Sequence, residues 1–293
     1  MSGAPLRFLD LLELGMLLAA KADRRKLADP SDDVEFYEEF FTDVDEGVAS
    51  ARADLRKQVR VSGVIDAVRR HVPKGSVLDV GCGIGETLSA MATLEHLDLH
   101  GLEYSQATLA RAAKFVGSRA RVHHGSATAL PFDDGSFEGI TCVEVLEHVA
   151  AEGRVLSEFR RVLKLGGVLV LTVPSRHWFP IQKSLIGHYR HYDRESLERV
   201  LSAAGLEVIE WLPNYPNWHR LADYSYVACS ALSRAASRRG RPALPTTVTL
   251  PGASTPLLEQ LFLALEPLRR RESALDYSGL PTSTSVVARK VGR

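Results

Sequence analysis

The stretch that decides the fold is Val77–Gly85, which reads VLDVGCGIG. A short apolar run, Ser76–Val80, follows the turn residues at 73–75, and such a run is typical of a buried parallel strand. Glycines follow at alternate positions: Gly81, Gly83 and Gly85. Glycine permits a sharp turn and close contact with a ligand, and Glu86 then opens a helical segment. This strand, turn and helix predict a nucleotide site at the carboxyl end of the strand.

Two acids indicate which nucleotide would bind. Asp79 lies two residues before the first glycine, where a carboxylate would repel a pyrophosphate and attract an ammonium or sulfonium group. A second apolar segment, LDLHGLEYS, predicts a strand that ends in Glu103, about 20 residues further on, where an acid can accept both ribose hydroxyls. The spacing G-x-G-x-G also differs from the G-x-G-x-x-G of dinucleotide sites. The sequence therefore favours a positively charged nucleoside.

These features resemble the class I S-adenosylmethionine (SAM) dependent methyltransferases, in the broad small-molecule branch known as the type 11 methyltransferase domain. The resemblance spans about residues 71–212 and returns at the last strand. It implies an α/β, Rossmann-like, seven-stranded, mostly parallel sheet with an antiparallel last strand, a helical N-terminal extension and a helical insertion before the last strand. The cofactor-binding residues that it implies are Asp79, Gly81, Cys82, Gly83, Gly85, Glu103, Tyr104, Ser126, Ala127 and Val143, with Tyr37 closing over SAM.

One position departs from the family pattern. Ser126 stands where the family usually has an aspartate that accepts a hydrogen bond from the adenine amino group. A hydroxyl can accept that bond without charge, so adenine recognition is expected to depend on backbone groups. At the end of the fourth strand, Cys142, Val143 and Glu144 are expected to border the methyl donor, and Glu144–Val149 to face the acceptor.

The resemblance and the element pattern divide the chain into four parts. These are an N-terminal helical cap at 1–71, a SAM-binding core at 72–212, a helical insertion at 213–279 and a closing strand at 280–293. The insertion is interpreted equally as a lid or as an interface, and a homodimer stays an open alternative.

Several elements of the core have defined ends in the sequence. A helix over Val48–His71 is expected to break or shift near Ser62 and Gly63. Ser105 predicts the N-cap of the next helix. Another helix, Ala151–Lys164, is expected to stop at Gly166 and Gly167, before a strand over Val168–Pro174, and Gly205 is expected to stop a helix that begins at Arg194.

Composition limits the possible partners. Lys plus Arg and Asp plus Glu both number 36 in 293 residues, and this zero net charge argues against a nucleic acid as the main partner. Cys82, Cys142 and Cys229 lack paired or metal-ligand spacing, as in a reduced, cytoplasmic protein. We expect no signal peptide and no membrane-spanning helix, because no basic leader and no sufficiently long uncharged run is present.

The chemistry implied by SAM is an in-line displacement, in which orientation of the acceptor supplies much of the acceleration. A general base adds roughly 10²–10⁴-fold when the acceptor is a hydroxyl. The catalytic candidates are His148, His188 and Glu144. Either histidine is alternatively an ordinary hydrogen-bonded structural residue. Aromatic and histidine side chains expected at the acceptor pocket are Tyr189, His191, Tyr215 and Trp218, although Tyr215 and Trp218 are alternatively packed aromatics.

A metal is a further possibility. Glu144, Glu147 and His148, with His188 later in the chain, resemble the metal-binding pattern of some ubiquinone-pathway O-methyltransferases and small-RNA 2′-O-methyltransferases. Side chains at i, i+3 and i+4 can meet on one helix face, and Mg²⁺ accepts carboxylate oxygens. The motif E-x-x-E-H is also common in relatives that use no metal, so the alternative without Mg²⁺ stays open.

Three classes of function follow from these observations. The first is a SAM-dependent methyltransferase acting on a small-molecule metabolite or natural product, at a hydroxyl or an amine. The second is a membrane-associated methyltransferase of a lipid or lipid-linked sugar, held by Leu6–Ala20, residues 234–241 and Leu257–Arg271. Membrane contact is not favoured, because the apolar face of Leu6–Ala20 is interpreted as a packing surface. The third is a non-catalytic SAM-binding protein.

Overall fold

The computed structural model describes residues 55–175, 188–212 and 283–292. The expected N-terminal cap up to residue 54, Tyr37 within it, and the insertion at 213–279 lie outside the described residues. For these segments the lid, interface and membrane interpretations stay predictions.

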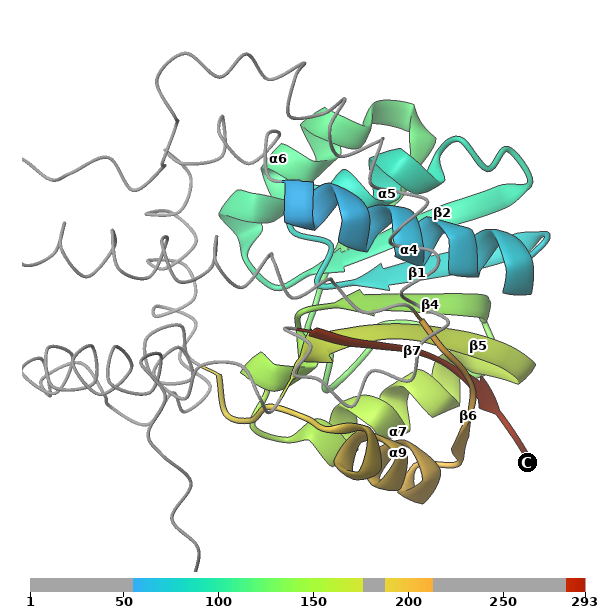
Figure 1. Cartoon of the computed structure of the whole chain (residues 1–293). Helices are drawn as coiled ribbons and strands as arrows, with labels where there is room; N and C mark the ends of the chain where they lie inside the picture. Colours follow the sequence, from blue (N-terminus) through green and yellow to red (C-terminus); the bar gives the residue numbers. More distant parts are fainter. Residues whose placement is uncertain (1–54, 176–187, 213–282, 293) are drawn as a thin grey trace, which may run out of the picture.

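The core is one seven-stranded sheet with strand order β3-β2-β1-β4-β5-β7-β6. The strands are β1 Gly75–Val80, β2 Leu97–Glu103, β3 Arg121–His124, β4 Phe137–Val143, β5 Leu163–Pro174, β6 Leu206–Trp211 and β7 Ser283–Lys290. Only β7 runs antiparallel to its neighbours, β5 and β6, and the other pairs described are parallel (Figure 1). The predicted mostly parallel sheet with an antiparallel last strand is confirmed.

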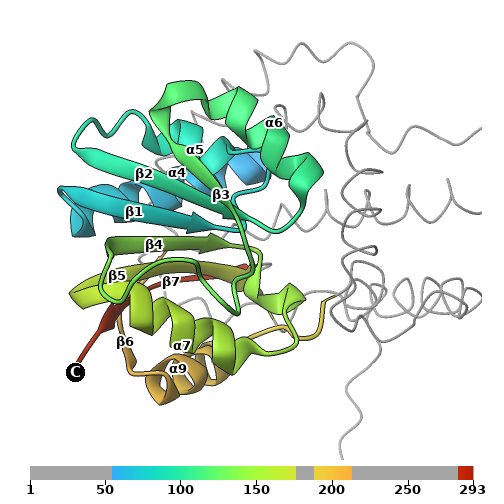
Figure 2. The ribbon, with the colours of Figure 1, turned by 180° about the vertical axis from the view of Figure 1, so that it is seen from behind.

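Helices cover both faces of the sheet. They are α4 Leu55–His71, α5 Glu86–Met91, α6 Gln106–Val116, α7 Glu152–Val162 and α9 Arg194–Ala203. Buried residues of α4, α5 and α6 form one apolar cluster with the sheet, and those of α7 and α9 form a second. Accordingly, α4 crosses in front of β1 in Figure 1 and lies behind it in Figure 2.

The first strand is buried on both sides, as its unbroken apolar run predicts. Val77 belongs to the cluster with α4 and α5, whereas Leu78 and Val80 belong to the cluster with α7 and α9. All three side chains are at most 1% exposed. The strand therefore holds the following glycine turn in the middle of the sheet, between β2 and β4.

Two helix boundaries agree with the local signals in the sequence. The Oγ of Ser105 accepts a hydrogen bond from the backbone N–H of Thr108, so Ser105 is the N-cap of α6. Helix α9 ends just before Gly205, which has a φ of 72°. Both boundaries depend on interactions within a few residues, which explains why the sequence was sufficient to predict them.

Two other expectations were wrong. Helix α4 runs without a break through Ser62 and Gly63. A glycine inside a helix costs about 1 kcal/mol relative to alanine, and burial of Val64 and Val68 nearby contributes more than that.

The end of α7 also differs from the expectation. The helix stops at Val162 rather than Lys164, and β5 starts at Leu163 rather than Val168. Leu163 pairs with Phe137 of β4, and both side chains are almost completely buried. This long-range pairing ends the helix before the glycines at 166 and 167 are reached.

Among the described helices, none is both long enough and apolar enough to cross a lipid bilayer.

Gly85 is expected to contribute to stability through packing. Its φ is 88°, and a Cβ there would lie 2.6 Å from Cγ1 of Val116 in α6. Gly85→Ala should therefore lower the free energy of unfolding by about 2–4 kcal/mol in urea denaturation, since backbone strain and steric overlap add.

The matched control is Gly166→Ala. Gly166 also has a positive φ, 78°, but a Cβ there would meet nothing within 4 Å. It should cost only the backbone strain, about 1–2 kcal/mol. Equal losses in the two variants would contradict the packing role of Gly85.

Candidate functional site

A cavity of about 370 Å³ lies at the carboxyl ends of β1, β2 and β4. Its wall includes Asp79 from β1, Glu103 from β2 and Val143 from β4, together with the glycine turn that follows β1. Ligands of open α/β sheets bind at this edge of the sheet. The cavity therefore occupies the place at which the sequence predicts a nucleotide.

Most residues expected to bind the cofactor line this cavity. They are Asp79, Gly81, Cys82, Gly83, Glu103, Tyr104, Ser126, Ala127 and Val143. Two of the catalytic candidates, Glu144 and His148, line it as well, whereas His188 does not.

Two expected neighbours of the ligand do not line the cavity. Gly85, the residue that precedes α5, instead packs against Val116 of α6. Cys142 is completely buried in the apolar cluster that includes α7, because alternate side chains of β4 point to opposite faces of the sheet. Its neighbour Val143 lines the cavity.

Hydrogen bonds tie the glycine turn to the end of β2. The backbone N–H groups of Gly81 and Cys82 both donate to the carbonyl of Leu102, at 2.8 and 3.0 Å. Gly81 and Gly83 have φ values of 69° and 54°, and a Cβ at Gly83 would point into open space. The turn thus presents bare backbone to a ligand, which is what glycine permits there.

Glu103 is held in place by three backbone donors. Its Oε2 accepts from the N–H of Gly83 at 2.9 Å, and its Oε1 accepts from Tyr104 and Ser105 at 2.9 and 3.0 Å. Charge-assisted bonds of this kind orient a carboxylate firmly. The acid is therefore set at the cavity wall beside the glycine turn.

Asp79 is only 2% exposed. Its Oδ1 accepts a 2.6 Å hydrogen bond from Oγ1 of Thr141, while its Oδ2 is buried without a hydrogen-bond partner among the described residues. Burial raises the pKa of Asp79 to about 7, the bond from Thr141 opposes this rise, and the charge of Glu103 adds to it. A cationic group in the cavity would stabilise the ionised form of this carboxyl.

The Ser126 hydroxyl takes part in a local turn. It lies 2.8 Å from Oγ1 of Thr128 and accepts from the N–H of Thr128 at 3.2 Å. The residue also lines the cavity, and the dependence of adenine recognition on backbone groups stays a prediction.

Glu144 also lines the cavity and has the unusual φ of 55°. Its N–H donates to the carbonyl of Thr172 at 2.8 Å, and its Oε2 lies 3.7 Å from Nη1 of Arg60. Arg60 comes from α4 and lines the cavity, and the sequence analysis missed it. The helical pattern of α4 does not indicate that this arginine faces a site formed by a distant loop.

The expected helix face over Glu144–Val149 does not form. A single 3-10 turn, η4 Leu146–His148, follows the left-handed residue Glu144. Glu147 consequently points into the protein and is completely buried, while His148 reaches the cavity wall. The prediction that Glu144, Glu147 and His148 share one helix face was wrong, because Glu144 has a left-handed backbone and lies outside the short 3-10 turn that contains the other two residues.

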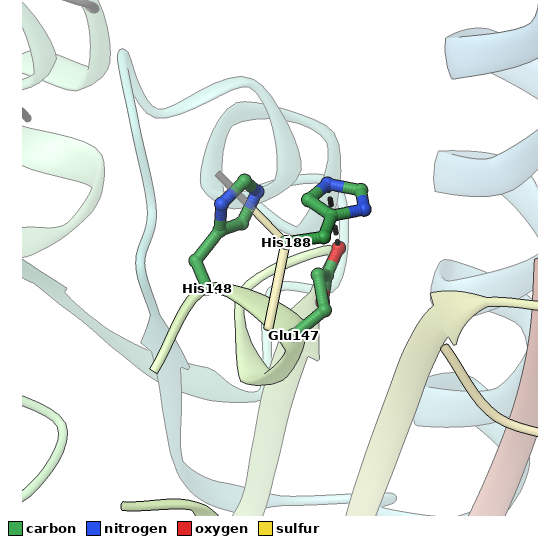
Figure 3. Close-up of side chains that lie close together, drawn as sticks. All are labelled: Glu147, His148 and His188. Atoms are coloured by element: carbon green, nitrogen blue, oxygen red, sulfur yellow. Dashed lines mark ion pairs between the residues drawn. The ribbon is translucent and has the colours of Figure 1, made fainter. Parts of the chain in front are cut away.

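The structure nevertheless brings three of the four expected metal ligands together. Donor atoms of Glu147, His148 and His188 lie within 4.8 Å of one another, and Glu144 is not part of this group. Figure 3 shows both imidazoles turned toward the same region as the Glu147 carboxylate. We call these three residues the Glu147 cluster.

The surroundings of the Glu147 cluster disfavour the charged forms of Glu147 and His188. Burial, and next the charge of Glu144, hold the pKa of Glu147 well above its usual range. Burial, together with His148 and His191, lowers the pKa of His188 to about 2.

Sequence similarity agrees with the geometry of the cavity. Residues 78–171 match the methyltransferase domain family. The demethylmenaquinone methyltransferase of Shouchella clausii is 34% identical over 136 residues, which are 44% of this chain and 55% of that protein. The demethylmenaquinone methyltransferase of Lysinibacillus sphaericus is 30% identical over 158 residues, which are 51% and 67% of the two chains. The chain spans about half the length of the first curated relatives it matches.

The fold is also similar to that of a solved enzyme. The [4+2]-cyclase SpnF superposes with a TM-score of 0.51 at 22% identity, covering 78% of this chain and 81% of that chain. At this level of identity the likeness shows a shared fold and nothing about the reaction.

Since the matched residues include the end of β1 and the glycine turn at the cavity, the sequence similarity and the sheet topology lead to one conclusion: the chain belongs to the class I SAM-dependent methyltransferases.

Proposed function

We propose that this chain transfers the methyl group of SAM to a hydroxyl or amine of a small-molecule acceptor. The observation that carries the proposal is one cavity lined by two chemically different groups of residues. We call the glycine turn with Asp79 and Glu103 the donor end, and we call Arg60, His148 and Tyr189 the acceptor end. A donor and an acceptor can therefore lie side by side.

The donor end suits a cationic nucleoside. Glu103 is positioned to accept hydrogen bonds from ribose hydroxyls, and Asp79 offers a buried carboxylate oxygen without a partner among the described residues. SAM carries an ammonium and a sulfonium group, so its charge would compensate the acid. A pyrophosphate would add negative charge to the same region.

The acceptor end combines apolar and polar side chains. Val61 and Val149 supply apolar surface, while Arg60 and Tyr189 supply polar contacts. Such a lining suits an aromatic ring that carries a hydroxyl. Two relatives are named demethylmenaquinone methyltransferases, and these names support a quinone-like ring as the acceptor.

The reaction requires no covalent intermediate on the protein. The acceptor oxygen forms a bond to the methyl carbon while the carbon–sulfur bond breaks, and its electron pair stays on sulfur. The products are S-adenosylhomocysteine and the methylated acceptor. The proton of the hydroxyl must leave as the bond to the methyl carbon forms. His148 at the cavity wall either accepts this proton or binds the group that accepts it.

Asp79 should make donor binding depend on pH. In the free protein its pKa is about 7, so below this pH a proton must be expelled when the cationic ligand binds. The affinity for SAM, measured by calorimetry, should fall by up to about tenfold per pH unit below 7. Asp79→Asn should weaken binding at pH 8 and flatten this dependence.

Binding of NAD serves as the control for the nucleotide class. If NAD bound tightly while SAM and S-adenosylhomocysteine did not, the donor assignment would be incorrect. An Asp79→Asn profile as steep as that of the original chain would remove Asp79 from the donor site.

His148 should affect turnover without affecting donor binding. With a panel of hydroquinones and catechols and methyl-labelled SAM, His148→Ala should reduce kcat by roughly 10²–10⁴-fold. The dissociation constant for S-adenosylhomocysteine should stay within about twofold, since the donor end is unchanged.

His123→Ala is the matched control, because His123 does not line the cavity. It should retain full turnover. Donor binding without turnover on any acceptor would instead support a non-catalytic SAM-binding protein.

A further inference from the structure

We propose that the Glu147 cluster is a binding site for one divalent first-row transition-metal ion, formed by Glu147, His148 and His188. Each residue offers one donor atom, and these atoms lie within 4.8 Å of one another (Figure 3). A common ion at the centre of such a group can be reached by all three. The site itself does not depend on the methyl-transfer proposal.

The strongest observation is the buried carboxylate of Glu147. The residue is 0% exposed, and neither of its oxygens has a hydrogen-bond partner among the described residues. A buried carboxylate without hydrogen bonds is costly in free energy unless it is paired or coordinates a metal. His188 approaches it, with Nε2 3.9 Å from Oε1, which is longer than a hydrogen bond. A cation between them would satisfy both groups.

The second observation is that hydrogen bonds from the two residues after His188 hold its segment against residues 147–150. The N–H of Tyr189 donates to the carbonyl of Glu147 at 2.8 Å. Arg190 donates from Nη1 to the carbonyl of Val149 and from Nη2 to that of Ala150, both at 2.6 Å. These bonds fasten the segment that carries His188 to the turn that carries Glu147 and His148.

A third observation concerns the orientation of the His188 ring. Its Nδ1 lies 2.9 Å from Nε2 of His191, so a hydrogen bond occupies that nitrogen. Nε2 is then the nitrogen that faces Glu147. Metal-binding histidines usually engage their second nitrogen in this way, which fixes the tautomer and the ring plane. His191 would thus be a positioning residue for the centre.

The donor set indicates the class of metal. Two imidazoles and one carboxylate suit zinc, iron, cobalt and manganese, whereas Mg²⁺ prefers oxygen ligands and keeps several waters. The Mg²⁺ suggested by the sequence pattern therefore fits these residues less well than a transition metal. Three protein ligands also leave coordination positions open, as in catalytic centres.

The place of the cluster connects it to the proposed reaction. His148 belongs both to the cluster and to the cavity wall, which Tyr189 and Glu144 also line. A divalent cation held there would lower the pKa of a bound acceptor hydroxyl. This role, unlike the binding site itself, rests on the proposed function, and it favours acceptors with a hydroxyl over those with an amine.

The test measures metal binding directly. The full chain is treated with a chelator, dialysed, and titrated with Co²⁺ while the visible absorption bands of cobalt are recorded. We expect one Co²⁺ per chain by elemental analysis, displacement by an equal amount of Zn²⁺, and no displacement by millimolar Mg²⁺.

The variants separate a metal centre from a buried structural cluster. Glu147→Gln keeps the shape of the side chain and should lower Co²⁺ affinity by at least about 100-fold, and His188→Ala should do the same. The control His123→Ala should bind Co²⁺ like the original chain, because His123 lies outside the cluster. Affinity for S-adenosylhomocysteine, measured on each variant, reports whether the core is folded.

Each outcome supports or overturns the proposal. Weak or non-stoichiometric binding of Co²⁺, or equal binding by Glu147→Gln in a variant that still binds S-adenosylhomocysteine, would overturn it. Preferential binding of Mg²⁺ would overturn the assignment of the metal class. If Co²⁺ bound as expected but neither SAM nor its product bound, the metal centre would stand and the proposed methyl transfer would fail.

Discussion

The site depends first on the hydrogen bonds between the glycine turn and the end of β2. Gly81 and Cys82 donate to the carbonyl of Leu102, and Gly83 donates to the carboxylate of Glu103. These bonds bring the carboxyl ends of β1 and β2 to one place and keep the bare backbone of the turn exposed to the cavity. Glu103 is oriented by this connection, whereas Asp79 lies within β1 and accepts its hydrogen bond from Thr141 of β4.

Two buried carboxyl groups share a second physical feature. Asp79 and Glu147 are almost completely buried, and each has at least one oxygen without a hydrogen-bond partner among the described residues. Burial raises the pKa of both groups. Polar groups left in this condition reduce the stability of the free chain. Under the proposals made above, SAM would bind beside Asp79 and a metal ion would bind to Glu147. The buried carboxyl groups therefore lower the stability of the free chain but favour the binding of these cations.

Errors in the sequence analysis occurred where distant contacts overrule local signals. Helix α7 ends at Val162 because Leu163 pairs with Phe137, although the glycines at 166 and 167 are the stronger local stop. Helix α4 continues through Gly63 because its neighbours are buried against the sheet. The segment after β4 is a 3-10 turn because Glu144 adopts a left-handed backbone and bonds to Thr172 of β5. None of these contacts is visible in the local pattern of residues.

By itself, the sequence determined the strand, turn and helix around Gly81, the strand that ends in Glu103, and the N-cap Ser105. These features follow from apolar periodicity, glycine geometry and capping, which all act within a few residues. Only the tertiary structure decided that Arg60 lies beside Glu144, that Gly85 packs on Val116, and that His188 joins Glu147 and His148. Such pairings arise when the sheet closes and brings distant segments together, and no local property of the chain specifies them.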